Sequence, residues 1–211
     1  MSLQGKRILV TCGPTWVALD DVRVISNRST GEMGHLLAKL LKTAKAKVTL
    51  LEGPVTDAVK ITGITVHKYC FFGELKDLLN RELKRGYDCV IHAAAVSDFG
   101  PKKKITGKIS SGSKLTLRLS PLPKLINKIK AIKPKIFLVG FKLESITRDR
   151  ASLRGTQKLF RQGRCDLVVA NFSSPSSYEA LVLDAEQSLL GKVKNKKDLV
   201  RLLVGILKER L

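Results

Sequence analysis

A polar segment between two regular patterns has the residue types of an anion site. Residues 7–12 are apolar and run into Gly13-Pro14-Thr15, as a buried parallel strand does where it breaks into a loop. From Glu32 to Ala46 apolar residues recur at helical spacing, so the Ser-Thr-Gly at 29–31 begins a helix, where free N–H groups and the helix dipole favour phosphate. Serine and threonine also cap helices that bind nothing. Phosphate binding and simple capping are therefore the two interpretations of this segment.

Length and hydropathy predict one globular domain over residues 1–211. Of the 211 residues 44% are hydrophobic, and the mean hydropathy is close to zero, which suits a domain with a substantial core. No apolar run approaches the roughly 18 residues of a membrane span, and the N-terminus does not have the pattern of a signal peptide. We therefore expect a soluble, cytoplasmic protein without a membrane partner.

The cysteines and histidines lack the spacing of metal ligands. None of the four cysteines forms a Cys-x-x-Cys pair, and the three histidines are scattered. The sequence therefore predicts no disulfide and no metal ligands of its own, and any metal would arrive with a nucleotide. The residues concerned are Cys12, Cys70, Cys89, Cys165, His35, His67 and His92.

The chain is strongly basic. Its net charge of +21 comes from 39 Lys and Arg against 18 Asp and Glu, and a field of this sign attracts phosphates, nucleic acid or acidic surfaces without distinguishing among them. Much of the excess lies in helix-like segments such as 124–135 and 192–197, and aromatic residues are only 5%. No nucleic-acid module with interleaved stacking residues is present, so nucleic-acid binding is not favoured.

Strand and helix patterns alternate along the chain. This order predicts an α/β fold, Rossmann-like and three-layered, with a mainly parallel sheet and helices on both faces. The fourth strand runs into Ser97-Asp98 at its carboxyl end, where such sheets bind ligands. The segment 100–114, rich in Lys, Gly and Ser, is a candidate mobile flap. Strands are expected at 7–12, 48–52, 64–68, 89–95, 115–119, 136–141, 167–170 and 179–183, and helices at 32–46, 75–83, 123–132, 147–162 and 197–207.

A nicotinamide-dependent oxidoreductase is one interpretation of this order. Glu52 ends the second strand and could hold a ribose hydroxyl, and residues 92–95 (His-Ala-Ala-Ala) resemble the fourth strand of short-chain dehydrogenases. However, no Gly-x-Gly-x-x-Gly turn follows the first strand, because Gly31 is the next glycine after Gly13. None of the three tyrosines has a lysine four residues later, so that family's Tyr-x-x-x-Lys pair is also missing. An NAD(P)-dependent oxidoreductase is therefore the alternative, not the leading hypothesis.

A more specific resemblance extends over almost the whole chain. The sequence resembles phosphopantothenate-cysteine ligase. Its Ile-Ser-Asn motif at 25–27 is closer to the bacterial, CTP-using branch than to the ATP-using eukaryotic one. It is similar to the stand-alone form, without a flavin-dependent decarboxylase domain. The segments that carry the resemblance, in the family's order, are 11–15 (TCGPT), 22–34 (VRVISNRSTGEMG), 94–98 (AAVSD), 107–109 (GKI), 115–117 (LTL), 121–126 (PLPKLI), 139–141 (VGF) and 165–171 (CDLVVAN).

The resemblance implies a step of coenzyme A biosynthesis. In that family 4′-phosphopantothenate, CTP and cysteine give phosphopantothenoylcysteine, CMP and pyrophosphate through an acyl-cytidylate intermediate, with Mg²⁺. The family also forms homodimers with sites near the subunit boundary, so the resemblance implies a homodimer.

Matching positions imply the roles of individual residues. Asn27 matches the asparagine that handles the acyl-cytidylate, Arg23 assists with phosphopantothenate, and Lys108 matches the flap lysine that contacts the triphosphate. Asp98 matches the aspartate that binds the nucleotide, at the ribose. The other implied nucleotide-binding positions are Gly13, Ser29, Thr30 and Gly31 around the triphosphate, Pro123, Lys124, Leu125 and Ile126, Phe141 beside the base, and Lys158.

Four positions depart from the family pattern. Pro14 stands where a second glycine is usual, and Glu32 where a basic residue is common. The family has two lysines late in the chain; Lys158 matches the first, and Gln162 replaces the second. Phe172 stands in place of an aspartate. These changes bear on nucleotide affinity and base preference more than on the fold. A nucleotide-binding paralogue that does not ligate, and a non-catalytic basic binding module, therefore stay open as alternatives.

Overall fold

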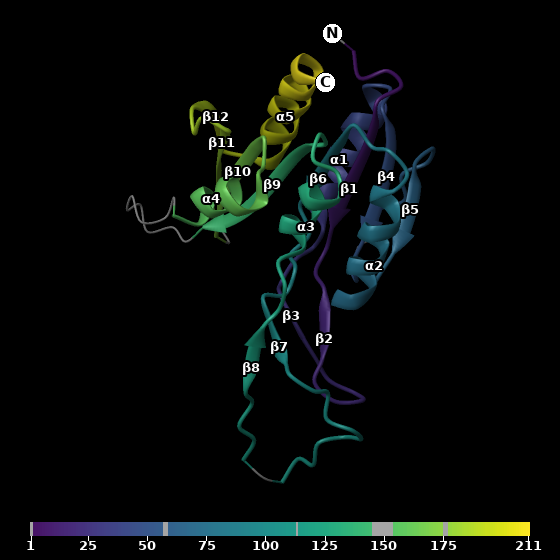
Figure 1. Cartoon of the computed structure of the whole chain (residues 1–211), viewed down its shortest axis with the longest axis vertical. Helices are drawn as coiled ribbons and strands as arrows, with labels where there is room; N and C mark the ends of the chain where they lie inside the picture. The colour runs from purple at the N-terminus through teal and green to yellow at the C-terminus, as the bar shows by residue number, and fades with distance from the viewer. Residues whose placement is uncertain (1, 57–58, 113, 145–153, 175–176) are drawn as a thin grey trace.

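An eight-stranded sheet forms the centre of the computed structural model, which describes residues 2–56, 59–112, 114–144, 154–174 and 177–211 (Figure 1). Six strands are parallel, and β11 and β12 run antiparallel at one edge. Across the sheet the order is β12 (Leu189–Val193), β11 (Tyr178–Asp184), β10 (Leu167–Ser173), β9 (Phe137–Glu144), β6 (Cys89–His92), β1 (Arg7–Cys12), β4 (Lys47–Glu52) and β5 (Thr65–Lys68).

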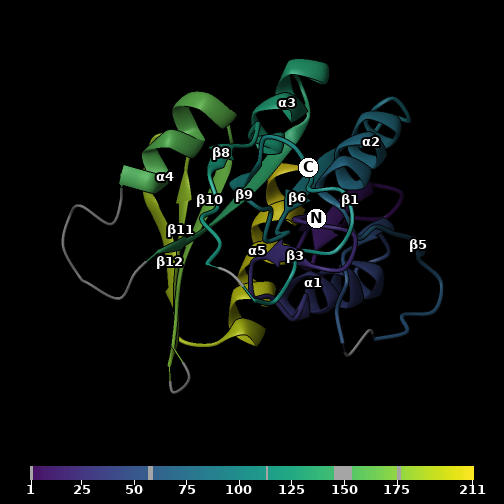
Figure 2. The same ribbon diagram turned by 90° about the horizontal axis from the view of Figure 1, so that it is seen from below.

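Helices cover both faces of this sheet (Figure 2). On one face α1 (Glu32–Thr43) and α5 (Lys196–Arg210) bury leucines against β1, β4, β6 and β9, and on the other α2 (Phe72–Leu83) and α3 (Leu125–Ile132) do the same. The central strands are buried on both faces, which explains their continuous apolar runs. The predicted three-layer, mainly parallel fold is confirmed. None of the helices in the described parts of the chain has the length and hydropathy of a membrane span.

Helix α1 lies directly on β1, and Gly34 makes this approach possible. A Cβ added at Gly34 would stand 2.1 Å from Cys12 Cβ. We expect Gly34→Ala to lower the free energy of unfolding by about 2–3 kcal/mol, because the helix must move off the strand. Gly205, inside α5, is the matched control, since nothing lies within 4 Å of an added Cβ there.

Urea unfolding of both variants tests this contact. Gly205→Ala should raise the free energy of unfolding by about 0.5–1 kcal/mol, since alanine is the better helix former. Equal effects of the two substitutions would contradict a specific contact between α1 and β1.

An arm extends from the carboxyl edge of the sheet (Figure 1). It consists of two short hairpin-like sheets, β2 (Trp16–Ala18) with β3 (Val24–Ser26), and β7 (Phe99–Pro101) with β8 (Leu119–Pro121). Residues 100–112 of the candidate flap lie within this arm, and residues 100 and 101 belong to β7. The sequence did not predict β2 or β3, because three-residue strands are too short for a periodic pattern.

Several predicted elements end elsewhere in the structure. The expected strand 115–119 is wrong, because only Leu119 belongs to a strand, and the alternating leucines 115, 117 and 119 have no buried sheet face to pack on and stay exposed. β6 stops at His92, where the chain turns away after pairing with β1. Of the helix expected at 147–162, residues 147–153 lie outside the described residues. The rest forms α4 (Arg154–Lys158) and a π-helical turn, η2 (Leu159–Gly163).

Candidate functional site

A cleft of about 860 Å³ opens at the carboxyl ends of the parallel strands. This is the edge at which parallel sheets bind ligands. It is bounded by the start of α1, the loop after β6, the start of α3, the ends of β9 and β10, and the start of α5. The structure therefore brings together segments that are far apart in the sequence. The predicted site residues that line it are Asn27, Ser29, Thr30, Gly31, Asp98, Pro123, Lys124, Leu125, Ile126 and Phe141.

Four other predicted site residues do not line this cleft. Gly13 lies behind it, where its backbone is 3.5 Å from the position of a Cβ on Gly31. Arg23 and Lys108 belong to the arm, and Lys158 is an exposed residue of α4, whereas the neighbouring Leu159 lines the cleft.

The start of α1 has the geometry of an anion site. Gly31 precedes the helix with φ 72°, a left-handed conformation that glycine adopts without strain. The Ser29 hydroxyl accepts a hydrogen bond from the Gly31 N–H at 3.3 Å, and the Thr30 hydroxyl accepts one from the Glu32 N–H at 3.4 Å. Both distances are long, so these bonds are weak and an anion can replace them. These hydroxyls and the N–H groups of the helix start are donors of the kind from which a phosphate accepts hydrogen bonds.

Three loops are joined beside this helix start. The Ser97 N–H donates to the Thr15 hydroxyl at 2.9 Å, and the Ser97 hydroxyl donates to the Thr15 carbonyl at 3.0 Å. Asn27 Nδ2 donates to the Val96 carbonyl at 2.9 Å. These bonds fix three segments relative to one another: the loop after β1, the loop after β6 and the segment that follows β3.

His92 lines the cleft as a neutral group. Its side chain is buried, and burial lowers its pKa to about 4. Nδ1 lies 3.0 Å from the Thr11 hydroxyl, which also accepts the Ala94 N–H. The imidazole therefore positions the backbone that follows β6 and adds no positive charge.

Basic side chains outnumber acidic ones around the cleft. Lys124 forms an ion pair with Asp98, and Lys196 forms one with Glu32. The negative charge that Glu32 adds to the helix start is thus balanced from the start of α5. The sequence did not predict Arg28, although it lies in the 22–34 motif, and no local pattern links Lys142 or Lys196 to a motif. The basic residues that line the cleft are Arg28, Lys124, Lys142 and Lys196.

Asp20 connects the turn between β2 and β3 to Ile109, in the candidate flap. Its carboxylate accepts hydrogen bonds from the backbone N–H of Ile109 at 3.0 Å and Val22 at 2.8 Å, and from Arg23 Nη1 at 2.5 Å. These bonds, the one from Ile109 first, hold the pKa of Asp20 well below its usual value, against the opposing effect of burial. The neighbouring Asp21 accepts the Gly107 N–H at 2.8 Å. Sequence reasoning missed Asp20, although the Asp-Asp pair before Val22 is a turn signal.

We expect Asp20→Asn to loosen the flap without unfolding the core. The amide loses the charge that strengthens these bonds, so protection of the Ile109 amide from hydrogen exchange should fall about tenfold. A lowered pKa in the fold means that the contribution of Asp20 is present above its unfolded pKa and is lost as the pH falls below about 4. Asp77→Asn, on the exposed surface of α2, is the control. Unchanged Ile109 protection in Asp20→Asn would show that the flap is held otherwise.

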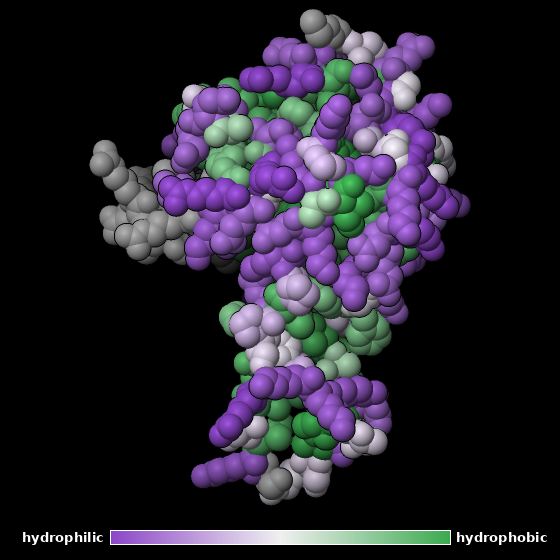
Figure 3. Space-filling view, in the orientation of Figure 1, coloured by the Kyte–Doolittle hydropathy of each residue, from purple (hydrophilic) through white to green (hydrophobic). Residues whose placement is uncertain are grey.

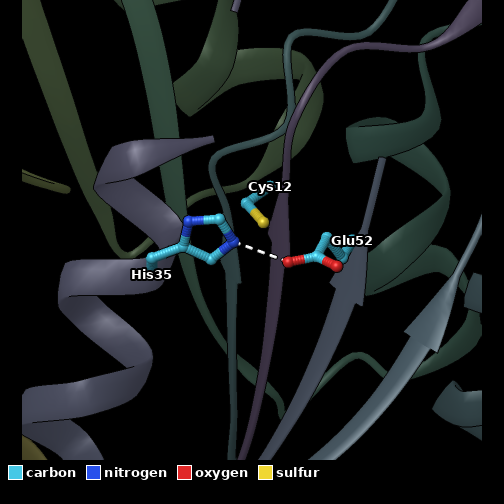
Figure 4. Close-up of side chains that lie close together, drawn as sticks. All are labelled: Cys12, His35 and Glu52. Carbon is cyan, nitrogen blue, oxygen red and sulfur yellow. Dashed lines mark hydrogen bonds and ion pairs between the residues drawn. The ribbon is translucent and has the colours of Figure 1, made fainter. Parts of the chain in front are cut away.

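Glu52 does not line the cleft. It is 4% exposed and forms a hydrogen bond of 2.6 Å with His35 Nε2, beside Cys12 (Figure 4). Burial, and secondarily Glu52, raises the pKa of the Cys12 thiol to about 12. The nicotinamide interpretation therefore loses the carboxylate that would hold the ribose.

Fold and cleft together define a Rossmann-like α/β protein with a cleft at the carboxyl edge of its sheet. Comparison with known proteins identifies the family. Residues 3–203 match the DNA/pantothenate metabolism flavoprotein C-terminal domain. The chain belongs to this family.

Relatives and solved structures agree with that assignment. The coenzyme A biosynthesis bifunctional protein CoaBC of Thermococcus kodakarensis is 38% identical over 81% of this chain and 42% of its own length. The chain thus spans less than half of that relative. The crystal structure of the DNA/pantothenate metabolism flavoprotein from Streptococcus pneumoniae is 25% identical, with a TM-score of 0.87 over 98% of this chain and 100% of that one. The C-terminal domain of a CoaBC protein gives a TM-score of 0.79 at 25% identity, over 99% and 96%.

Proposed function

We propose that the protein is a phosphopantothenate-cysteine ligase that uses CTP. The observation that carries this proposal is the convergence of motif residues from five separate segments, Asn27 to Asn171, on one cleft. The name of the Thermococcus relative, a bifunctional protein of coenzyme A biosynthesis, supports the same pathway. We treat residues 1–211 as a single ligase domain with a flap near 100–114.

The proposed reaction has two steps. The carboxylate of 4′-phosphopantothenate attacks the α-phosphate of CTP, and pyrophosphate leaves with the electrons of the broken P–O bond. The cysteine amine then attacks the acyl carbon, loses a proton, and expels CMP. Activation is needed because oxide is too poor a leaving group for direct amide formation. Binding the reactants in one cleft makes both attacks effectively intramolecular.

The cleft provides donors for the charge that these steps create. The N–H groups at the start of α1 and the hydroxyls of Ser29 and Thr30 suit the triphosphate. Arg28 and Lys142 add positive charge at the walls. Asn27 is placed to hydrogen-bond the acyl-cytidylate, where carbonyl charge develops. Asp98 is assigned to the ribose and Phe141 to the base, as the family pattern implies.

Mg²⁺ fits the donors of this cleft. Magnesium bound to a nucleotide takes most of its ligands from phosphates and water and one or two from carboxylates, and Glu32, in the first turn of α1, is a carboxylate that lines the cleft. Bound there, Mg²⁺ would stabilise the charge that grows on the leaving pyrophosphate.

A homodimer is part of the proposal, and the arm supports it. Exposed apolar side chains gather on the arm (Figure 3). Arg23 and Lys108 lie on the arm, so pairing of two arms would carry them toward the boundary between two subunits. The exposed apolar residues of the arm are Val22, Val24, Phe99, Ile105, Leu115, Leu117 and Leu119.

We place the reaction in the cytoplasm, where thiols such as the four free cysteines stay reduced.

Pyrophosphate release tests the proposed function. Purified protein is incubated with Mg²⁺, 4′-phosphopantothenate and CTP, with and without cysteine, and the assay is repeated with ATP. Release that cysteine stimulates, with CTP preferred, is the expected result. Preference for ATP would overturn the assignment of the nucleotide. Binding of CTP without release by folded protein would leave a nucleotide-binding paralogue as the function.

A further inference from the structure

Three metal-ligating side chains meet behind the start of α1 (Figure 4). Cys12 ends β1, His35 lies in the first turn of α1, and Glu52 ends β4. Cys12 Sγ, a ring nitrogen of His35 and a carboxylate oxygen of Glu52 all lie within 4.8 Å of one another. All three side chains are buried, with exposures of 0%, 4% and 4%. None of them lines the cleft, so the proposed ligase reaction does not use this cluster.

The donor types suit zinc and not magnesium. Thiolate, imidazole and carboxylate are the ligands that Zn²⁺ takes in proteins, and three of them with a water complete its tetrahedron. Mg²⁺ prefers oxygen ligands in an octahedron, which this set does not offer. The cluster is therefore distinct from any magnesium that accompanies a nucleotide.

We propose that Cys12, His35 and Glu52 bind one Zn²⁺ ion. The charges balance, because a thiolate and a carboxylate neutralise the two positive charges of the metal in a place from which water is largely excluded. On binding, the Cys12 thiol releases a proton to solvent. The imidazole presents the Nε2 lone pair and keeps a proton on Nδ1, and the metal replaces the bond of 2.6 Å between Nε2 and Glu52.

A zinc ion here, with one water as its fourth ligand, would connect three elements of the fold. It joins the ends of β1 and β4 to α1 one turn after Gly31, and the adjacent Gly34 already touches Cys12. Zinc here fixes the helix start relative to the sheet. Binding by the folded state alone stabilises it, so we expect saturating Zn²⁺ to raise the Tm by about 5 °C or more.

Cobalt provides the direct test, since a Co²⁺–thiolate bond gives a charge-transfer absorption band. Metal-free protein is titrated with Co²⁺ under nitrogen and then with Zn²⁺ as competitor. The expected result is one equivalent of Co²⁺ with that band, displaced by Zn²⁺. Cys12→Ala should abolish the band, and Glu52→Gln should weaken binding by about 100-fold or more, since even the loss of outer-shell partners costs 10- to 100-fold. Cys89→Ala, which removes another fully buried strand thiol, is the matched control and should bind normally.

Two results would overturn the site. One is the absence of a thiolate band with the unaltered protein, which needs no variant to interpret. The other is a band that survives in Cys12→Ala or is lost in Cys89→Ala. If Cys12→Ala does not fold, as judged by circular dichroism, His35→Gln replaces it, and normal Co²⁺ affinity in that variant would equally exclude the site.

Discussion

Replacing Asn27 with alanine is expected to lower the rate of phosphopantothenoylcysteine formation by about 100- to 1,000-fold, the usual cost of losing one donor to a developing oxyanion. The side chain is exposed at the cleft, and its Nδ2 is held by the carbonyl of Val96. Because the triphosphate donors are separate groups, the Kd for CTP should change by only a few-fold. Turnover and calorimetric titration of CTP measure the two quantities.

The control for this prediction is Asn80→Ala, an asparagine in α2 away from the cleft, which should have normal turnover. Normal turnover of Asn27→Ala would remove Asn27 from the reaction. Equal losses in CTP affinity and in turnover would instead make it a residue that holds the loops around the triphosphate.

Lys108→Ala should lower kcat by about 100-fold while leaving the Tm unchanged. Lys108 is exposed on the arm and has no core packing to lose, so an effect on turnover would come from its charge on the nucleotide. Steady-state kinetics and thermal unfolding measure the two effects. Lys103→Ala, an exposed lysine of the same segment, is the matched control, and equal losses in both variants would indicate a general effect of positive charge.

Mixing two inactive variants tests whether Lys108 acts in the cleft of its own subunit or in that of the other subunit. If the arm of one subunit reaches the cleft of the other, subunit exchange between Asn27→Ala and Lys108→Ala rebuilds one intact site in each mixed dimer. Activity should then return to at most about a quarter of normal, from the random pairing of two kinds of subunit. No recovery, despite demonstrated exchange, would place Lys108 in the cleft of its own subunit.

The sequence predicted the layers of the fold because buried parallel strands and amphipathic helices have strong local patterns. Gly31 and Asp98 could be placed at the carboxyl edge by the same argument, because strand ends share one edge. Other features depend on contacts between distant segments. The pairing of Lys196 with Glu32 spans most of the chain, and Cys12, His35 and Glu52 meet only because β1, α1 and β4 are neighbours. The leucines of 115–119 alternate as in a strand, but alternation alone does not show whether a neighbouring strand is present to pair with it.

The span of the cleft along the chain also affects how the protein folds. Its walls run from Asn27 to Lys196, so a chain that has completed only its first half cannot form them. Such non-local closure slows folding, because loop entropy is lost before the contacts form. A ligand that needs both ends of the cleft therefore binds only the finished fold and shifts the folding equilibrium toward it. Retention of nucleotide by a newly made chain would therefore indicate that α5 has packed against the sheet.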